Sequence, residues 1–496
     1  MSERGNEDMV RFLLDRHEYL DTVDNEGNTP LHMASKSGKL VIVQLLIDAG
    51  SDITTVNSNG DSAIYVASIH GHLLIAFHLI EQGADIHAKT LAGWTPISAA
   101  AEYGHVEVAR ALLANKADIN VQSNDGRTSL YLATVSGKTE MVKLLLDNGA
   151  KPDITTQTGY TALSAASEFG HSEIVRLLLV ANANVNIASN DNYTPLHFAI
   201  RKRHLGIARQ LIANKADVNA LFQDSRTVLY DAATDGHQDS VQLLLESGAD
   251  PNLAQEQRFT PLSAAAEFNH MEVVQLLLSY NADTSIVSVE GNSPLYLAAM
   301  RGNLDIVKLL VDAGADTDAT RPDGFTPIMM AAQNGHLEIV KLLLEQNVHV
   351  SAMTTFGSTA LYWASINNHQ SIVELLLQHN AETSTKIISS GRTALIAAIE
   401  SGNVDIAMLL IDAGADVHVT VDDGSTALHL ASKGGYKELV SLLLDKGSSL
   451  VEDADGFTPE QLARDNNHND VADLLAERRH RLSSFRYRLK TTLKRS

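Results

Sequence analysis

Imidazole is the side-chain group that could most readily carry out acid–base or metal chemistry in this sequence, which has 20 histidines and no cysteines. His70 and His72 are close in sequence, but no carboxylate and third ligand accompany them at a spacing typical of zinc. A phosphate-binding P-loop, a Gly-x-Ser-x-Gly elbow and a kinase motif set are absent from the sequence. Twelve histidines instead recur at two repeated positions, where hydrogen bonds within or between repeats would explain them: His72, His105, His171, His204, His237, His270, His336, His369 and His468 at one, and His32, His197 and His429 at the other. We therefore predict a protein that is not an enzyme and uses no cofactor or metal.

A second kind of chemistry, partner binding, is indicated at the end of the segment TPLHFAIRKRH. There Arg201, Lys202, Arg203 and His204 follow one another in a chain of net charge −22. Elsewhere the places of Arg201 and Lys202 hold a glutamate followed by an aromatic residue: Glu102 with Tyr103, Glu168 with Phe169, and Glu267 with Phe268. The same three repeats carry an aromatic residue just after the turn, of which Trp94 is one. Aromatic and charged groups of this kind are typical anchors of a protein interface. The alternative is that the Glu–aromatic pairs serve packing between layers.

These candidate residues are positioned by a repeated element of 33 residues, of which 14 copies can be aligned on a turn position. Thr or Ser lies two residues after every turn position, where it can cap a helix, and Ala lies seven residues after it, where it keeps that helix thin. A second helix with an apolar stripe follows, as in residues 139–147. Because one repeat cannot bury its own apolar face, we expect the copies to stack as a solenoid. The turn positions are Gly27, Gly60, Gly93, Gly126, Gly159, Asn192, Ser225, Arg258, Gly291, Gly324, Gly357, Gly391, Gly424 and Gly456.

The segments TPLH (29–32 and 194–197) and TALH (426–429), each with Ala two residues after it, resemble the ankyrin repeat, and the resemblance runs from about residue 6 to 477. It implies an all-α repeat solenoid of stacked helix-turn-helix repeats, curved and elongated, with β-hairpin fingers and a concave face that binds other proteins. We expect four parts: a partial N-terminal capping repeat (1–23), ankyrin repeats 1–13 (24–452), a C-terminal capping repeat (453–477) and a basic amphipathic tail (478–496).

The resemblance also implies a modification, because ankyrin repeats can be hydroxylated on an asparagine of the hairpin. Matching places hold Asn120, Asn186, Asn219 and Asn252. The alternative is that these asparagines only help the turn.

The middle of the array departs from its own pattern. Tyr193 precedes the TPLH cap, and the next finger places Leu221 and Phe222 near its tip, where most repeats have small or polar residues. Three successive turn glycines are replaced by Asn, Ser and Arg, of which Ser and Arg tolerate a left-handed backbone poorly, so we expect the middle fingers to differ in shape. One interpretation is sequence drift. The other is that Arg201 and Lys202 lie beside exposed aromatic rings and bind an acidic or phosphorylated segment. It predicts that Phe222→Ala combined with Arg201→Glu folds normally and loses its main partner.

The C-terminal segment 478–496 holds eight Arg and Lys residues and no acid. Four apolar residues can share one side of a helix there: Leu482, Phe485, Leu489 and Leu493. This pattern suits docking on the acidic solenoid, a nuclear-import or nucleic-acid patch, contact with anionic lipid, or binding in a partner's groove, and a disordered solubilising end is the alternative. Ser484 also resembles an acceptor for basophilic kinases, and phosphate there would weaken electrostatic docking.

Composition bounds the setting of the protein. The acidic balance disfavours nucleic acid as the main partner and favours basic partners, or it simply aids solubility. The N-terminal segment MSERGNEDMV has no apolar signal core, and no run approaches the ~20 apolar residues of a membrane span, so we expect a cytoplasmic protein, with the nucleus as a second compartment. We also expect the protein to be monomeric. The leading hypothesis is a non-enzymatic scaffold or adaptor. The alternatives are a regulator of a partner, as enzyme inhibitor or ubiquitin-ligase substrate receptor, and a membrane-surface tether acting through the tail.

Overall fold

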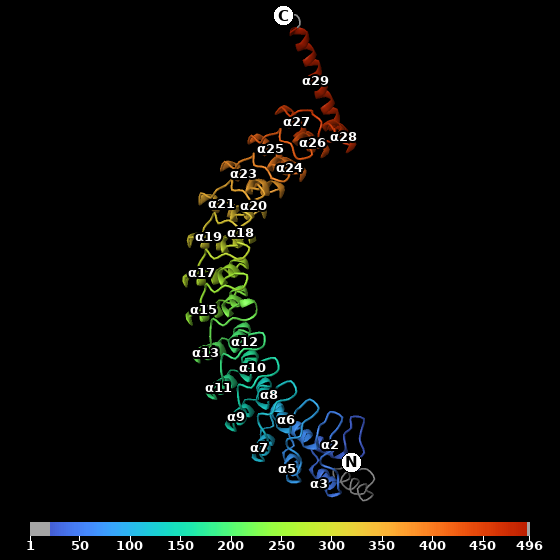
Figure 1. The fold of residues 1–496 in the computed structure, drawn as a ribbon, viewed down its shortest axis with the longest axis vertical. Helices are drawn as coiled ribbons and strands as arrows, with labels where there is room; N and C mark the ends of the chain where they lie inside the picture. Colours follow the sequence, from blue (N-terminus) through green and yellow to red (C-terminus); the bar gives the residue numbers. More distant parts are fainter. Residues whose placement is uncertain (1–19, 494–496) are drawn as a thin grey trace. The chain divides into compact units, whose positions relative to one another are not determined.

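The computed structural model describes residues 20–493, except for the side chains of Gln223 and of residues 483–493. These described residues form 28 α-helices and one short 3-10 helix, η1 (Gln223–Ser225), without a β-sheet (Figure 1). The chain divides into two compact units. Unit 1 holds the residues up to 232 together with 239–250, and unit 2 holds 233–238 together with the residues from 251 onward.

Each repeat contributes a short first helix and an antiparallel second helix. In unit 1 the first helices are α2 (Pro30–Lys36), α4 (Ala63–Ile69), α6 (Pro96–Tyr103), α8 (Ser129–Val135), α10 (Ala162–Phe169), α12 (Pro195–Arg201) and most of α14 (Val228–Thr234). The second helices are α3 (Leu40–Asp48), α5 (Leu73–Glu81), α7 (Val106–Ala114), α9 (Thr139–Asp147), α11 (Ser172–Val180), α13 (Leu205–Ala213) and most of α15 (Gln238–Glu246).

Unit 2 repeats the same arrangement. Its first helices are α16 (Pro261–Glu267), α18 (Pro294–Arg301), α20 (Pro327–Gln333), α22 (Ala360–Ile366), α24 (Ala394–Glu400), α26 (Ala427–Lys433) and α28 (Pro459–Asp465). Its second helices are α17 (Met271–Ser279), α19 (Leu304–Asp312), α21 (Leu337–Glu345), α23 (Gln370–Gln378), α25 (Val404–Asp412), α27 (Lys437–Asp445) and α29 (Asn469–Leu493).

The predicted Thr and Ser caps are confirmed at the start of the first helices. The Thr128 hydroxyl accepts the backbone N–H of Tyr131 at 3.2 Å at the start of α8. In repeats with a TPLH or TALH segment the histidine extends the cap, because the N–H of Thr29 donates to Nδ1 of His32 (3.2 Å). Nε2 of the same ring then reaches the carbonyl of Asp61 in the next finger at 2.8 Å. A helix of only seven residues depends on such caps, since its backbone satisfies few of its own end groups.

The alanine of each first helix allows the layers to pack closely. Ala67, Ala100, Ala133 and Ala166 are fully buried in unit 1, and consecutive first helices from α2 to α12 contact one another. The second helices bury their apolar stripe in the same way, as Leu145 of α9 does. The core of unit 1 is therefore a stack of thin layers, because protein interiors are packed as densely as organic crystals and leave no room for larger residues.

A hydrogen-bond ladder joins successive repeats at the turn between the two helices. Nε2 of His105 lies 2.8 Å from the carbonyl oxygen of Ile69, 36 residues earlier. The predicted role for these histidines is confirmed at seven positions by the same contact: His72, His105, His171, His204, His270, His336 and His369. Asn303 and Asn403 donate to the preceding repeat in the same place. Imidazole here satisfies the free carbonyl at a helix end.

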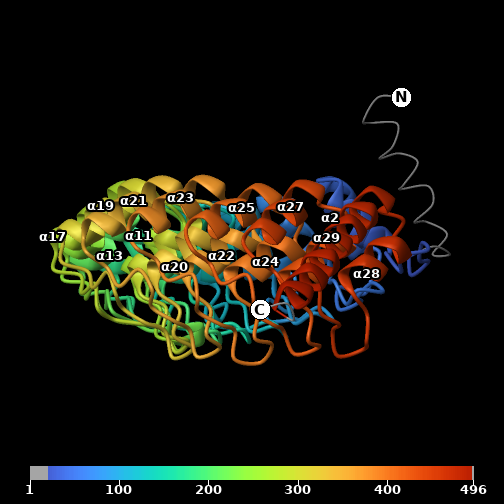
Figure 2. The same ribbon diagram turned by 90° about the horizontal axis from the view of Figure 1, so that it is seen from above.

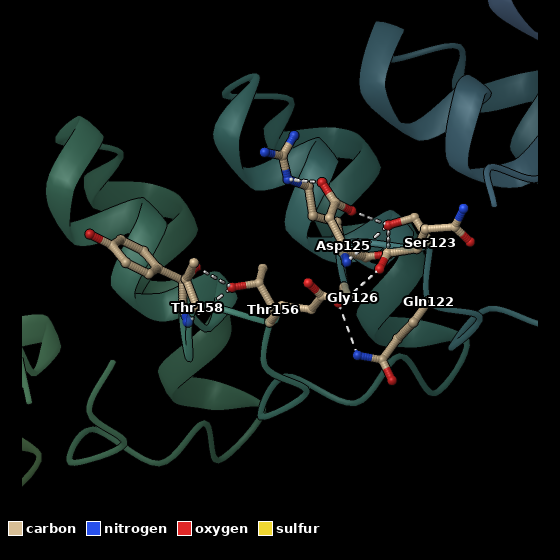
Figure 3. Close-up of polar contacts among 10 residues, drawn as sticks. Gln122, Ser123, Asp125, Gly126, Thr156 and Thr158 are labelled. Atoms are coloured by element: carbon tan, nitrogen blue, oxygen red, sulfur yellow. Dashed lines mark hydrogen bonds and ion pairs between the residues drawn. The ribbon is translucent and has the colours of Figure 1, made fainter. Parts of the chain in front are cut away.

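The fingers project to one side of the helix pairs in each unit (Figure 2). They are tight turns, and among the described residues their β-structure amounts to three isolated antiparallel bridges. Polar side chains hold each turn and bind it to the next. Gln122 donates to the carbonyl of Gly126 within its finger (2.9 Å) and to the carbonyl of Thr155 in the next (3.0 Å) (Figure 3). Gly126 is required here, because its φ is +84° and a Cβ would lie 2.8 Å from the backbone N of Gln157.

We expect Ala133→Leu to destabilise unit 1 by roughly 1–3 kcal/mol, because the new side chain has no space between α8 and its neighbours. The measurement is chemical unfolding followed by circular dichroism. Ala114→Leu, at the exposed end of α7, is the matched control and should change the unfolding midpoint little. Equal effects of the two substitutions would show that close stacking does not limit this position.

Candidate partner-binding site

The Glu–aromatic pairs and the Arg–Lys pair occupy equivalent places at the ends of first helices. We call the six residues in unit 1 the helix-end row: Glu102 and Tyr103 of α6, Glu168 and Phe169 of α10, and Arg201 of α12 with the following Lys202. The three helices belong to one stack, in which α8 contacts both α6 and α10, and α10 contacts α12. Tyr103 and Phe169 are 51% and 52% exposed, while both glutamates are half-buried. The row therefore presents rings and charges to solvent at successive layers.

The third Glu–aromatic pair and Trp94 lie in different surroundings. Glu267 ends α16 in unit 2, and its carboxylate binds Arg301 at 2.6 Å, while Phe268 stays exposed. Trp94 is half-buried in its finger, where its backbone N–H donates to the Thr90 hydroxyl at 3.1 Å. Within unit 1, the structure places two of the three Glu–aromatic pairs in the same helix stack as Arg201.

The middle of unit 1 contains a packed cluster of aromatic rings. The Phe222 centroid lies 4.9 Å from that of Tyr193 and 4.7 Å from that of His197. Tyr193 in turn contacts Phe198, a fully buried core residue. Phe222 is only 3% exposed, so the expectation of an exposed ring at this fingertip is wrong. A hydrophobic ring in a finger gains more by packing on Tyr193 and His197 than by facing water.

Cations cover this cluster on its solvent side. The Arg201 guanidinium carbon lies 5.4 Å from the Tyr193 centroid, and that of Arg226 lies 5.1 Å from the Phe222 centroid. Leu221, beside Phe222, is 47% exposed. The expectation that Arg201 lies near Tyr193 is confirmed. What faces solvent is thus Arg201, Lys202, half-buried Tyr193 and Leu221.

The finger that carries Phe222 has an altered backbone, as the sequence predicted for this region. Asp224 and Ser225 both adopt positive φ (56° and 57°) within η1. Asn192 and Arg258, at the flanking turn positions, keep the single left-handed residue of the standard turn, each with φ of 62°. The change of shape is therefore confined to the finger of η1, where two adjacent non-glycine residues are strained.

His197 has lost a hydrogen bond that its counterparts make. His32 and His429 reach a carbonyl of the next finger through Nε2, at 2.8 and 3.2 Å. His197 still caps α12 through Nδ1, but its buried Nε2 has no hydrogen-bond partner. Burial lowers the pKa of His197 to about 4, although the Ala220 carbonyl and Asp217 act in the opposite direction. The ring is thus held neutral against Phe222, at the cost of an unsatisfied polar atom.

Arg203 is a residue whose conformation sequence reasoning missed. It has a φ of 59°, whereas every other repeat from Gly38 to Asn467 holds Gly or Asn at this left-handed place. A comparison of this turn across the repeats would have found it. A bulky side chain in this conformation costs on the order of 1 kcal/mol or more. Backbone strain of this kind concentrates at functional sites, which adds a second departure next to the Arg201–Lys202 pair.

The side chains of the four finger asparagines link successive repeats by hydrogen bonds. Oδ1 of Asn120 accepts the backbone N–H of Lys151 at 2.9 Å, and its Nδ2 donates to the carbonyl of Gly149 at 3.5 Å. The same pair of contacts is made by Asn186, Asn219 and Asn252. Both ends of each amide are therefore engaged, so a structural role is established, and hydroxylation stays a prediction.

The basic tail begins as a direct continuation of the last repeat. Helix α29 runs without a break across the boundary predicted at residue 478. Arg478 donates to the Leu444 carbonyl and pairs with Asp445, both at 3.3 Å, and Arg479 pairs with Glu460 at 3.1 Å. The side chain of Ser484 and of the tail residues after it lies outside the described residues, as do most of the residues of the predicted N-terminal cap, 1–19.

The sequence analysis also missed an apolar patch on the outer helices. Leu74 and Phe77 of α5 are 66% and 47% exposed. Other repeats hold charged residues at these places, such as Glu107 and Arg110 in α7, which form an ion pair at 3.5 Å. The signal was present in the sequence as two apolar replacements at positions that are charged in most repeats.

The described residues contain no group of three or more His, Asp or Glu side chains placed to hold a metal ion. None of the helices in this part of the chain combines the length and apolar character that crossing a bilayer requires.

Comparison with known families gives one result. A family model described as ankyrin repeats (three copies) matches residues 1–90, 64–156, 136–222, 163–255, 219–288, 262–354, 328–421 and 409–484. No curated protein matched the chain.

We expect Arg203→Gly to stabilise the protein by roughly 0.5–1 kcal/mol, because glycine adopts a φ of 59° without steric cost. Chemical unfolding measures this change. The reverse substitution at the equivalent place of another repeat, Gly170→Arg, is the control. It should destabilise the protein, since Gly170 has a φ of 79° and a Cβ there would lie 2.8 Å from the His204 ring. A destabilised Arg203→Gly variant would mean that the arginine side chain itself holds the turn.

The pKa of His197 predicts a loss of stability in acid. The unfolded chain binds this proton near pH 6.5 and the folded protein only near pH 4, so the stabilisation is complete above pH 6.5 and is lost as the pH falls towards 4. His197→Gln removes the titration and keeps a capping acceptor, as Gln461 does for the Thr458 N–H at 2.8 Å. We expect the variant to lose less stability than the unmodified protein between about pH 7 and about pH 5 in urea unfolding. Equal losses would rule out a ring held neutral in the fold.

Proposed function

The chain belongs to the ankyrin repeat family, and from this premise we propose that it is a non-enzymatic scaffold or adaptor that recruits a protein segment to the helix-end row of unit 1. Ankyrin repeats are generally protein–protein interaction modules. A binding role rather than catalysis is supported because the histidines that could do acid–base chemistry are engaged as caps and inter-repeat ties.

The observation that carries this proposal is the pair of exposed cations at the end of α12, which form no ion pair among the described residues. Among the described residues neither Arg201 nor Lys202 has an ion-pair partner, and both are exposed. Arg201 is held over the Tyr193 ring, and Leu221 adds exposed apolar surface. A guanidinium fixed on a ring and a neighbouring ammonium suit a carboxylate or phosphate group. The proposed partner is therefore a protein segment that carries an acidic or phosphorylated residue.

Engagement of the tail favours the adaptor over the membrane tether. Arg478 and Arg479, at the base of the tail, already pair with Asp445 and Glu460 of the last repeats. These contacts support docking of the tail on its own solenoid, since each cation used there is removed from an anionic membrane surface.

The proposal is tested by the double variant Arg201→Glu, Lys202→Glu. Both side chains are exposed, so the variant should fold normally and lose its main partner in pull-down and crosslinking mass spectrometry from the native cell. Lys143→Glu with Arg209→Glu, on the outer helices α9 and α13, changes the net charge equally and should keep the partner. Unchanged partner recovery with the first variant would reject the site.

Phe222→Ala is unsuitable for this test. The ring is buried against Tyr193 and His197, and removing it would cost roughly 3–5 kcal/mol. The Phe222→Ala, Arg201→Glu variant should therefore be destabilised, contrary to the expectation from the sequence alone that it folds normally. Arg201→Glu with Lys202→Glu avoids this loss because both side chains are exposed.

A further inference from the structure

The helix-end row of unit 1 carries charges of both signs that form no ion pair among the described residues. Within the described part of the chain, the carboxylates of Glu102 and Glu168 form no ion pair, and neither do Arg201 and Lys202. The salt bridges that unit 1 does contain lie elsewhere, for example Glu173 with Arg176 on α11 and Asp125 with Arg127 in a finger. None of the ion pairs among the described residues of unit 1 involves the row, so its carboxylates and its cations are both available to a ligand.

Unit 2 provides an internal comparison at the same repeat positions. There Glu267 binds Arg301, 34 residues later, at 2.6 Å. The equivalent residues in unit 1 are Glu168 and Lys202, also 34 apart, and they are not paired. The geometry of the repeat therefore allows a salt bridge between adjacent layers. In unit 1, neither Glu168 nor Lys202 forms one among the described residues.

Each Glu–aromatic pair has the composition of a cation site. A half-buried carboxylate lies next to an exposed ring, Glu102 with Tyr103 and Glu168 with Phe169. Lys and Arg bind to such a combination through an ion pair and through the negative face of the ring. Glu173, at the start of the second helix of the same repeat, already pairs with Arg176, whereas Glu168 has no ion-pair partner among the described residues.

The anionic and cationic parts of the row are close to each other. The hydroxyl of Tyr160 interacts with charges of both signs. Burial raises its pKa, the Glu168 carboxylate raises it further, and the Arg201 guanidinium lowers it. His204, which follows the Arg–Lys run, lies 3.2 Å from the Glu168 carbonyl and joins the two layers. One ligand segment can therefore reach Glu168 and Arg201 together.

We propose that the partner segment is bipolar: an extended chain whose Lys or Arg residues occupy the Glu102–Tyr103 and Glu168–Phe169 pairs and whose carboxylate or phosphate occupies Arg201 and Lys202. This inference rests on the proposed function and adds to it the charge pattern of the partner. A segment with acidic groups alone would be repelled by Glu102 and Glu168, and a basic one by Arg201 and Lys202.

Layer spacing fixes the register of that pattern. Adjacent helix layers are ~8–10 Å apart, and an extended chain advances ~3.3 Å per residue. Glu102 and Glu168 belong to repeats two layers apart, so the two basic residues should be about five or six residues apart. Arg201 is one layer beyond Glu168, so the acidic or phosphorylated residue should lie about three residues beyond the second basic one.

The probe is a fluorescent synthetic peptide of Ser and Thr spacers with two lysines about six residues apart and a phosphoserine about three residues beyond the second. The peptide is synthesised once in this order and once with its sequence reversed. Its binding to the full-length protein is followed by fluorescence anisotropy at low salt. Three control peptides replace the lysines by serine, replace the phosphoserine by serine, or move each lysine by three residues. The protein variants are Glu102→Lys with Glu168→Lys, and, as a control on the outer helix α9, Glu140→Lys with Asp147→Lys.

We expect the bipolar peptide to bind in one direction, and each control peptide to bind roughly threefold to tenfold more weakly per displaced or removed charge. Glu102→Lys with Glu168→Lys should weaken it similarly and should bind better a peptide that carries glutamates in place of the lysines. The α9 control should bind like the unmodified protein.

Two results would overturn the inference in distinguishable ways. If the lysine-free phosphopeptide binds as tightly as the bipolar one and still requires Arg201 and Lys202, the bipolar pattern is wrong and the proposed function stands. If binding is indifferent to Arg201→Glu with Lys202→Glu, or if no peptide of the set binds, both the inference and the site in unit 1 are rejected.

Discussion

Close stacking of thin layers is the constraint on which every other feature of this protein depends. A first helix of seven or eight residues buries too little of its own surface to be stable, so each repeat gains its core only from its neighbours. Fully buried alanines such as Ala100 and Ala166 let the helices approach, and histidines such as His105 tie each turn to the carbonyl of the previous repeat. These two requirements explain why most of the sequence repeats, since almost any change at a stacking position creates a clash or an unsatisfied polar group.

Residue types can vary at positions that do not take part in the stacking, and they vary more in some repeats than in others. The ends of first helices are exposed, and there unit 1 varies between Glu–aromatic pairs and the Arg201–Lys202 pair. Nearby, the repeat rules themselves are broken: Arg203 occupies a left-handed position, Asp224 and Ser225 distort a finger, and His197 lacks its usual hydrogen bond. Several departures from an otherwise strict pattern in adjacent repeats are typical of a region retained for binding, because each costs stability that the template would provide.

Sequence reasoning predicted the candidate site only in part, and Phe222 illustrates the limit. Its position near the finger tip was evident from the alignment of repeats, and an exposed ring was expected there. The structure buries it against Tyr193 and His197, which belong to the preceding repeat. A fingertip residue contacts side chains about 25–30 positions away in the chain, so its burial depends on how two fingers lie together. The open state of Glu168 and Lys202 depends on the same kind of distant contact, since Glu267 and Arg301 make the equivalent bridge.

By itself, the sequence determined the repeat length, the two helices of each repeat, their caps and their stacked core. These follow from local chemistry repeated many times: a left-handed turn at a glycine such as Gly126, a hydroxyl cap such as Thr128, and an alanine such as Ala133. Only the tertiary structure decided which rings and charges face solvent. Phe222 is buried, Arg201 lies over Tyr193, Arg203 is strained, and the carboxylate of Glu168 forms no ion pair among the described residues. The physical reason is that exposure and pairing are set between layers, by side chains about a repeat apart, whereas helix and turn formation are set within one.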